Sequence, residues 1–490
     1  MFEINGSHIA ELNDTDLRSL VVRLCEAELR RVGLPRSAVI AGGDQNAPDG
    51  GLDVRVELPA SASISGFIPR PVTGFQVKVP DMSRKAILAE MRPKGTIRPD
   101  IQGLAEASGA YIIISSKGST SYSALQRRRN TMREAVADVQ NSENLELEFY
   151  DRDRLASWVR DHPGLVVWVR EKIDKPIRGW RPYANWANPQ EKVDAEYILD
   201  TKSRIQDWRT KAEGPIGVVD GLERIRGVLA HPKGAVRLIG LSGMGKTRLV
   251  QALFDERVGG QPLDPALPVY CDLADEPEPS PRDLVRNLIQ NRQRAIVVVD
   301  NCPPATHSAL MKVCTDAESA LSLITMEYDV GDDDPEGTEV FRHEPASDSV
   351  IEHLLESLRP QISQLNRRRI AEFSEGNARV ALALAHTVSR GDSIANLTDR
   401  ELFERLFHQR RAQDEGLLKA AEICSLVYSF NGEGGDATEL PFLAKLAELS
   451  VKSTLPLYRR TALAWVGSMP WPLESCVAPG ACEYSCKLGT

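Results

Sequence analysis

Residues 240–247 are the part of the chain that most constrains its fold. Their sequence, GLSGMGKT, fits the pattern G-x-x-x-x-G-K-[ST] of a phosphate-binding loop. Glycines at both ends of such a loop let the backbone turn tightly and bring its N–H groups against phosphate oxygens. Residues 235–239 favour a short strand and residues 247–254 a helix, which is the setting that the motif requires. We therefore predict a nucleoside triphosphate site formed by Gly240, Leu241, Ser242, Gly243, Met244, Gly245, Lys246 and Thr247.

Two side chains of this loop carry specific expectations. Lys246 is expected to reach the β- and γ-phosphates, and Thr247 to offer its hydroxyl to Mg²⁺. Downstream, the five apolar residues 295–299 end in Asp300, and such a run is typical of a buried parallel strand. An acid at the carboxyl end of that strand would hold Mg²⁺, directly or through water.

The residue that follows Asp300 indicates how fast a bound nucleotide is hydrolysed. Asn301 comes after Asp300 at the place where many active ATPases have a glutamate, so we expect slow hydrolysis. Residues 320–327 form a further apolar strand. Its polar end, Thr325 or Glu327, is expected to lie beside the γ-phosphate as a sensor.

The N-terminal part of the chain holds a second group of polar residues. An amphipathic helix from Asp14 to about residue 32 is followed by strands at residues 52–58 and 74–79. The alternation of a strand puts Gln76 and Lys78 on one face, and an adjacent strand would bring Asp53 beside them. A carboxylate, an amide oxygen and a lysine suit metal-dependent phosphodiester hydrolysis. The alternative interpretation is that these are ordinary solvent-facing residues of two strands.

A basic cluster, residues 127–129 together with Arg133, lies on the helix predicted over residues 121–136. Such a cluster is either a solvated helix face or a strip that contacts DNA phosphates. No platform of interleaved aromatic residues is evident, so double-stranded DNA is favoured over single strands.

The segments DGGLDV and GFQVKV, residues 49–54 and 74–79, resemble the D…(E/Q)xK core of the PD-(D/E)xK nucleases, and most of all the Mrr-type restriction endonucleases. The resemblance implies that Asp53 and Gln76 are metal ligands and that Lys78 is the catalytic lysine. The family also uses an acid on the first helix. Glu26 and Glu28 are both candidates, and we take Glu26 as the prediction.

The order of the later motifs is similar to that of the STAND class of AAA+-like ATPases. These motifs are the phosphate-binding loop, the strand ending in Asp300, the strand containing LIT, and a helical region containing EGNAR, residues 375–379. In this class the helical lid touches the nucleotide through G-x-P. Here Ala378 replaces the proline, so we carry over only Gly376 and Arg379.

The combination of both parts resembles the bacterial antiviral STAND proteins of anti-phage defence. The resemblance implies a switch that binds ATP and Mg²⁺ and that a phage protein trigger converts into a homo-oligomer, for instance a tetramer. Assembly would then let the N-terminal nuclease cut double-stranded DNA with Mg²⁺. Two alternatives remain: an ATP-dependent restriction endonuclease that acts on modified DNA without a trigger, and a truncated ATP-binding scaffold without activity.

We therefore expect an α/β multidomain chain. A length of 490 residues predicts about three domains, and the net charge of −9 excludes a basic character of the whole chain. No apolar run is long enough for a membrane span and the N-terminus has no signal-peptide pattern, so we predict a cytoplasmic protein. The predicted domains are a nuclease-like α/β domain (1–175), a Trp/Pro-rich connector (176–214), a P-loop NTPase core with a parallel sheet (215–345), a helical lid (346–410), a partial winged-helix region (411–460) and an atypical tail (461–490).

The tail differs in composition from the rest of the chain. It is rich in Cys, Trp and Pro and has no clear period. We expect that the chain is truncated or frameshifted after about residue 460, since related proteins continue into sensor repeats and no such repeat is visible here.

Overall fold

The computed structural model describes residues 3–42, 52–119, 121–183, 186, 197–198, 202–208, 210, 214–327, 337–389, 393–407 and 444–446. The predicted tail and all but residues 444–446 of the predicted winged-helix region lie outside these residues, as do residues 49–51 of the DGGLDV segment. The chain forms two compact units. The first contains residues 1–193, 226–236 and 253–325, and the second contains residues 194–225, 237–252 and 326–490.

The first unit begins with a five-stranded sheet in the order β1-β2-β3-β4-β5. β1 and β2 pair antiparallel, as do β2 and β3, whereas β3, β4 and β5 run parallel. The strands are β1 (Val39–Ala41), β2 (Val54–Glu57), β3 (Val72–Lys78), β4 (Ala110–Ser115) and β5 (Glu146–Asp151). The helices are α1 (Gly6–Ala10), α2 (Asp14–Arg31), α3 (Arg84–Met91), α4 (Pro99–Glu106), α5 (Tyr122–Ala135), α6 (Arg152–Arg160) and α7 (Pro163–Lys172).

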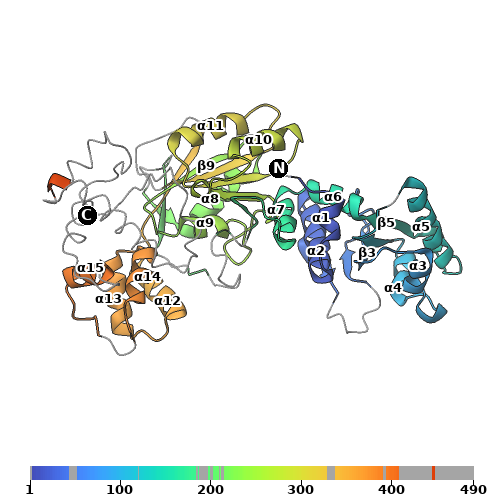
Figure 1. Ribbon diagram of the computed structural model, residues 1–490, viewed down its shortest axis with the longest axis horizontal. Helices are drawn as coiled ribbons and strands as arrows, with labels where there is room; N and C mark the ends of the chain where they lie inside the picture. The colour runs from blue at the N-terminus through green and yellow to red at the C-terminus, as the bar shows by residue number, and fades with distance from the viewer. Residues whose placement is uncertain are drawn as a thin grey trace. The chain divides into compact units, whose positions relative to one another are not determined.

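Alternation along β4 distributes its side chains between two apolar layers. Tyr111 and Ile113 pack with α3, α4 and α5, while Ile112 and Ile114 pack with α2 and α6. All six residues of β4 are buried, as expected for a parallel strand that is covered on both faces. Figure 1 shows α3, α4 and α5 on one side of this sheet and α1, α2 and α6 on the other.

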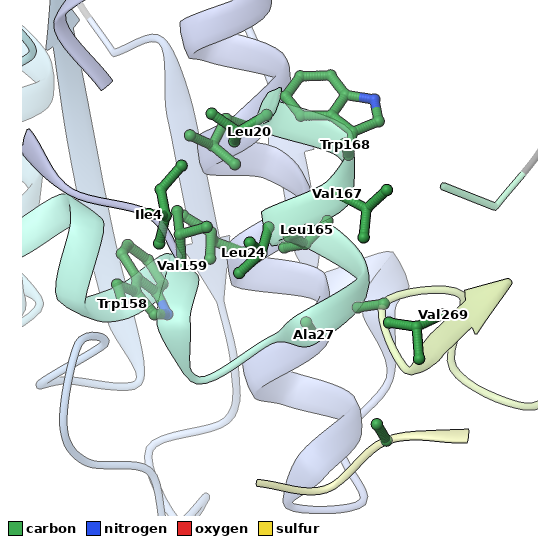
Figure 2. Close-up of a cluster of buried hydrophobic side chains, with 14 of the residues drawn as sticks. Ile4, Leu20, Leu24, Ala27, Trp158, Val159, Leu165, Val167, Trp168 and Val269 are labelled. Atoms are coloured by element: carbon green, nitrogen blue, oxygen red, sulfur yellow. The ribbon is translucent and has the colours of Figure 1, made fainter. Parts of the chain in front are cut away.

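Helix α2 packs its apolar stripe against α6 and α7, as Figure 2 shows. Val269 of β10 belongs to the same cluster, so the core of the five-stranded sheet continues into the strands of residues 268–300. Two polar contacts also join the N-terminal helices to the residues before β10. The Gly164 amide donates to the Ala266 carbonyl oxygen (3.1 Å), and Arg30 pairs with Asp264 (3.5 Å).

The second sheet has eight strands in the order β6-β10-β11-β12-β9-β13-β7-β8, and the division between the two units falls within β9. β10, β11 and β12 are parallel, and β6 joins β10 antiparallel. Its strands are β6 (Trp180–Arg181), β7 (Arg204–Asp207), β8 (Ile216–Gly217), β9 (Ala235–Ile239), β10 (Pro268–Asp272), β11 (Ile296–Asp300), β12 (Ser322–Met326) and β13 (Glu339–His343). Helices α10 (Pro281–Gln290) and α11 (Pro304–Cys314) belong to the first unit.

The second unit contains α9 (Lys246–Ala252) and a cluster of four helices, α12 (Asp348–Leu358), α13 (Gln364–Ser374), α14 (Ala378–His386) and α15 (Asp399–Phe407). Figure 1 shows α12 to α15 gathered into one group, and they share an apolar core that contains Ile351, Ile370 and Leu384. This group lies where the sequence predicts a helical lid. Helix α8 (Val218–Ala230) contributes to both units.

No helix in the described part of the chain combines the length and the apolarity of a membrane-spanning segment.

The core between α2 and α6 gives a stability prediction. Leu24 is fully buried, so Leu24→Ala should lower the free energy of unfolding by about 2–5 kcal/mol through lost apolar contact and the cavity left behind. Urea unfolding followed by circular dichroism measures the change. The control is Val32→Ala at the end of the same helix. Val32 is 48% exposed, so this change should cost no more than about 0.5 kcal/mol. Equal losses in both variants would contradict the packing.

Candidate functional site

The loop between β9 and α9 has the backbone geometry of a tight turn around three glycines. Gly240, Gly243 and Gly245 have φ values of 144°, 84° and 92°, which L-residues with side chains rarely adopt. Space imposes the same restriction. A Cβ atom at Gly240 would lie 2.7 Å from the His343 carbonyl oxygen, and one at Gly243 would lie 2.3 Å from Asn377 Oδ1. Glycine is therefore required at two places in this loop for steric as well as conformational reasons.

Lys246 is folded back over the loop that precedes it. Its Nζ donates to the carbonyl oxygens of Gly240 (2.7 Å) and Leu241 (2.9 Å), and the side chain is buried. Thr247 follows in the first turn of α9. The predicted phosphate-binding lysine thus lies inside its own loop, where backbone carbonyls compensate for its loss of water.

Helix α14, which belongs to the predicted lid, touches the loop at Ser242. Asn377 caps this helix, and its Nδ2 donates to the Ser242 carbonyl oxygen (2.9 Å). Arg379 Nη1 donates to Ser242 Oγ (3.1 Å). The structure therefore brings the predicted lid residue Arg379 to the loop. It also adds Asn377, which the sequence analysis missed although an Asn directly before a helix is a common N-cap.

His343, the last residue of β13, is a second contact of the loop that the sequence did not indicate. Burial, and after it the charge of Lys246, lowers the pKa of His343 to about 4. The imidazole is therefore neutral at physiological pH and adds no positive charge beside Lys246.

Asp300 and Thr325 belong to the first unit, and each has a neighbour that fixes its side chain. Tyr270 Oη donates to Asp300 Oδ2 (3.2 Å), and burial raises the pKa of Tyr270, so the hydroxyl keeps its proton. Thr325 is buried, and its Oγ1 lies 2.8 Å from Nδ1 of the buried His307.

Asn301, directly after Asp300, links the ends of two parallel strands. It has a positive φ of 51°, and its Nδ2 donates to Asp272 Oδ1 (2.8 Å). Asp272 and Asp300 are partners in the β10–β11 register. The side-chain amide of Asn301 is thus bound to the carboxylate of Asp272, which is a structural role.

In the five-stranded sheet, Asp53 stands opposite Gln76. The Val54–Phe75 register of β2 and β3 continues into Asp53, whose amide donates to the Phe75 carbonyl oxygen (2.9 Å). Its carboxylate oxygen Oδ2 accepts from Gln76 Nε2 and from the Val77 amide, both at 2.7 Å. Burial raises the pKa of Asp53 above its usual value, although the Val77 amide, Arg18 and Lys78 act in the opposite direction.

Three buried polar atoms near Asp53 have no hydrogen-bond partner in the described structure: Gln76 Oε1, Tyr111 Oη and Arg18 Nε, which forms an ion pair with Asp53. Gln76 is only 4% exposed, so its oxygen is an acceptor withdrawn from water. Tyr111 lies on the same face of the sheet, because Gln76 pairs with Ile113 in the β3–β4 register and Tyr111 comes two residues before Ile113. An unpaired buried acceptor beside a carboxylate is costly unless a ligand completes it.

Lys78 lies on the same face of β3 as Gln76. Its Nζ pairs with Glu90 Oε2 (3.2 Å), and Arg98 Nη2 donates to Glu90 Oε1 (2.9 Å). Glu90 was not among the predicted site residues. A sequence signal existed, because α3 follows β3 directly and carries this acid on its partly buried side.

The two candidate glutamates on α2, Glu26 and Glu28, have different surroundings in the structure. Glu28 is 3% exposed, and its Oε1 is within hydrogen-bond distance of Trp158 Nε1 (3.1 Å) and His162 Nε2 (3.3 Å). Glu26 lies about two helical turns beyond Arg18, the residue of α2 that contacts Asp53. Among the described residues, Glu26 makes no ion pair or hydrogen bond with Asp53. A role for Glu26 stays a prediction.

The basic cluster on α5 is partly used inside the domain. Arg128 pairs with Asp81 (2.6 Å) and Arg129 with Glu148 (2.5 Å). Arg127 and Arg133 are exposed. Only part of the cluster is thus available to an external phosphate.

No three His, Cys, Asp or Glu side chains within the described ranges are grouped to hold a metal. The Asp53–Gln76 pair is a smaller set, composed of one carboxylate and one amide oxygen.

No family model matches the chain, and no curated protein matches it in sequence. Among solved structures, a STAND protein with a tetratricopeptide repeat sensor from Pyrococcus horikoshii is 10% identical, with a TM-score of 0.26; the match covers 55% of this chain and 41% of that one. PCH-2 from C. elegans is 13% identical over 34% of this chain and 59% of that one, with a TM-score of 0.24. Trip13 from Rhizobiales is 10% identical over 50% of this chain and 84% of that one, with a TM-score of 0.20. These scores are low, so conclusions on function rest on the chain's own geometry.

The state of His343 predicts a pH dependence of stability. Its pKa is about 4 in the fold against 6.5 for an ordinary histidine, so below pH 6.5 the unfolded chain binds the proton more readily. The stability from the neutral imidazole is therefore lost as the pH falls from 6.5 to 4, in total roughly 3 kcal/mol. His343→Gln should make the decline of the unfolding midpoint with acidification shallower. His353→Gln, at an exposed position of α12, should keep the wild-type slope. Identical slopes in all three proteins would exclude this assignment.

Proposed function

We propose that this chain is a nucleotide-switched protein whose N-terminal region is a Mg²⁺-dependent nuclease for double-stranded DNA. The observation that carries the nuclease is the juxtaposition of Asp53 with Gln76, whose oxygen is buried and unpaired, on the face of β3 that also bears Lys78. A solvent-facing polar stripe would not bury an unsatisfied amide oxygen, so this arrangement favours a ligand.

The residues present fit a hard divalent cation. The carboxylate of Asp53 and the unpaired Oε1 of Gln76 are oxygen donors of the kind that Mg²⁺ prefers, and they would hold it. A bound cation would polarise the scissile phosphate and lower the pKa of a water molecule. The Val77 amide, which donates to Asp53 Oδ2, would fix the orientation of this carboxylate.

Lys78 would act on the phosphate through its charge. Its ammonium is positioned by Glu90, which Arg98 in turn holds, so the side chain is directed before substrate arrives. A preorganised positive charge stabilises the negative charge that develops during hydrolysis. The exposed Arg127 and Arg133 would add attraction for the DNA backbone.

The phosphate-binding loop would supply the switch. On ATP binding, Lys246 would exchange the carbonyl oxygens of Gly240 and Leu241 for phosphate oxygens. Since Asn377 and Arg379 already contact Ser242, occupation of the loop acts directly on helix α14. Thr247 and Asp300 would hold the Mg²⁺ of ATP, and Thr325 would act as sensor.

The biological role that we propose, anti-phage defence, is supported by the sequence resemblance to antiviral STAND proteins. A phage protein trigger would favour the assembled state because a ligand shifts an equilibrium by its differential affinity for the two states. Assembly into a homo-oligomer such as a tetramer would gather the nuclease sites on DNA. Trigger-independent cutting of modified DNA would instead indicate a restriction enzyme, and no cutting under any condition would indicate a scaffold.

A plasmid cleavage assay tests the nuclease. Lys78→Ala should reduce the cleavage rate by about 100-fold or more, since it removes a charge that stabilises the transition state. Lys85→Ala removes an exposed lysine of the neighbouring helix α3 and should leave the rate within about twofold. Cleavage that persists in Lys78→Ala would remove this lysine from the mechanism, and cleavage that persists in Asp53→Asn would remove the site.

Nucleotide binding and coupling are tested with Lys246→Ala. We expect the affinity for ATP to fall by about tenfold or more, because the variant lacks the cation that faces the phosphates. Triggered DNA cleavage should be lost with it. The control, Lys312→Ala on the exposed side of α11, should retain both. If Lys246→Ala abolishes ATP binding but not cleavage, the nuclease is not under nucleotide control.

A further inference from the structure

The carboxylate of Asp53 carries a third partner, which comes from α2. Its Oδ2 is used by Gln76 and Val77, whereas Oδ1 lies 3.2 Å from Arg18 Nε. This contact is an ion pair without hydrogen-bond geometry, because Arg18 Nε is buried and makes no hydrogen bond. The guanidinium of Arg18 therefore lies at Asp53 Oδ1, the oxygen that Gln76 and Val77 leave for a cation.

Arg18 contacts a second carboxylate at the same time, on its own helix. Its Nη2 lies 3.1 Å from Asp14 Oδ2, one turn earlier. The side chain of Asp53 is 10% exposed, that of Arg18 28% and that of Asp14 38%, so the pair with Asp14 is the more solvated of the two. The guanidinium can leave Asp53 and still keep a carboxylate partner.

We propose that Arg18 competes with the divalent cation for Asp53, and that Asp14 retains the guanidinium when the cation binds. The inference rests on the proposed nuclease function. A cation bound directly to Oδ1 would lie about 2.1 Å from that oxygen, in the region that the guanidinium now occupies. Two positive charges at one oxygen repel each other, so binding requires Arg18 to move away.

The same contact supplies a compensating charge to Asp53. A carboxylate with this little exposure needs a compensating charge, and removal of one partner of such a pair leaves an uncompensated charge. Arg18 therefore stabilises the metal-free protein and weakens metal binding. A purely structural arginine would do only the first.

The test is calorimetric titration of Mn²⁺ into the nucleotide-free full chain, together with melting temperatures without metal. Asp53→Asn defines which part of the binding belongs to this site. Arg18→Gln should tighten the Asp53-dependent binding by about fivefold or more and should lower the metal-free melting temperature. The matched control is Arg55→Gln, which removes the same charge from β2, where Arg55 contacts Glu57 (3.4 Å). It should change Mn²⁺ affinity by less than about twofold.

Asp14→Asn separates the two roles that Asp14 could have. If Asp14 acts by holding Arg18, its loss should weaken Mn²⁺ binding in the wild-type background and have little effect in the Arg18→Gln background. Equal weakening in both backgrounds would make Asp14 a direct ligand and overturn this part of the proposal. Arg18→Lys keeps the positive charge but has a single nitrogen, so it cannot contact Asp53 and Asp14 through two separate atoms. Its Mn²⁺ affinity should lie between those of the wild type and Arg18→Gln. It also serves if Arg18→Gln does not fold.

The remaining outcomes distinguish the inference from the function on which it rests. Unchanged or weaker Asp53-dependent Mn²⁺ binding in Arg18→Gln would overturn the competition while the metal site stands. Mn²⁺ binding that is the same in wild type and Asp53→Asn would remove the metal site, and with it both proposals.

Discussion

The bonds that Asp53 accepts from the Val77 amide and from Gln76 are the interactions on which the candidate nuclease site depends. They hold a charged side chain at the start of β2, where few water molecules can compensate for it. Because side chains alternate along β3, burial of Phe75 and Val77 against the α2 layer turns Gln76 and Lys78 to the opposite face. One strand thus serves both the core and the site.

A second constraint ties this region to the strands that end in Asp272 and Asp300. Buried Glu28 requires donors, and Trp158, His162 and Arg31 supply them from α6, the start of α7 and α2 itself. Helix α7 in turn approaches the second sheet closely, since a Cβ atom at Gly164 would lie 2.5 Å from the Ala266 carbonyl oxygen. The nuclease-like region and β10 therefore share one apolar core.

In the loop of residues 240–247, a buried charge is compensated by groups of the chain itself. Lys246 is satisfied by carbonyl oxygens of its own loop, and the adjacent His343 is kept neutral by burial. Contacts from Asn377 and Arg379 hold Ser242. In the proposed switch, phosphate oxygens would take the place of the two carbonyl oxygens that Lys246 contacts.

The sequence by itself predicted the tight turn at residues 240–247, the strand that ends at Asp300, and a position of Asp53 near Gln76, because glycine spacing and strand alternation are local properties of the chain. Only the tertiary structure decided which charges meet. It placed Arg18 and Asp14 rather than Glu26 at Asp53, directed Glu28 into the core, paired Lys78 with Glu90, and brought Asn377 and His343 to the loop. These contacts join residues far apart in the chain or on different helical faces, and their partners are set by packing, which no local pattern records.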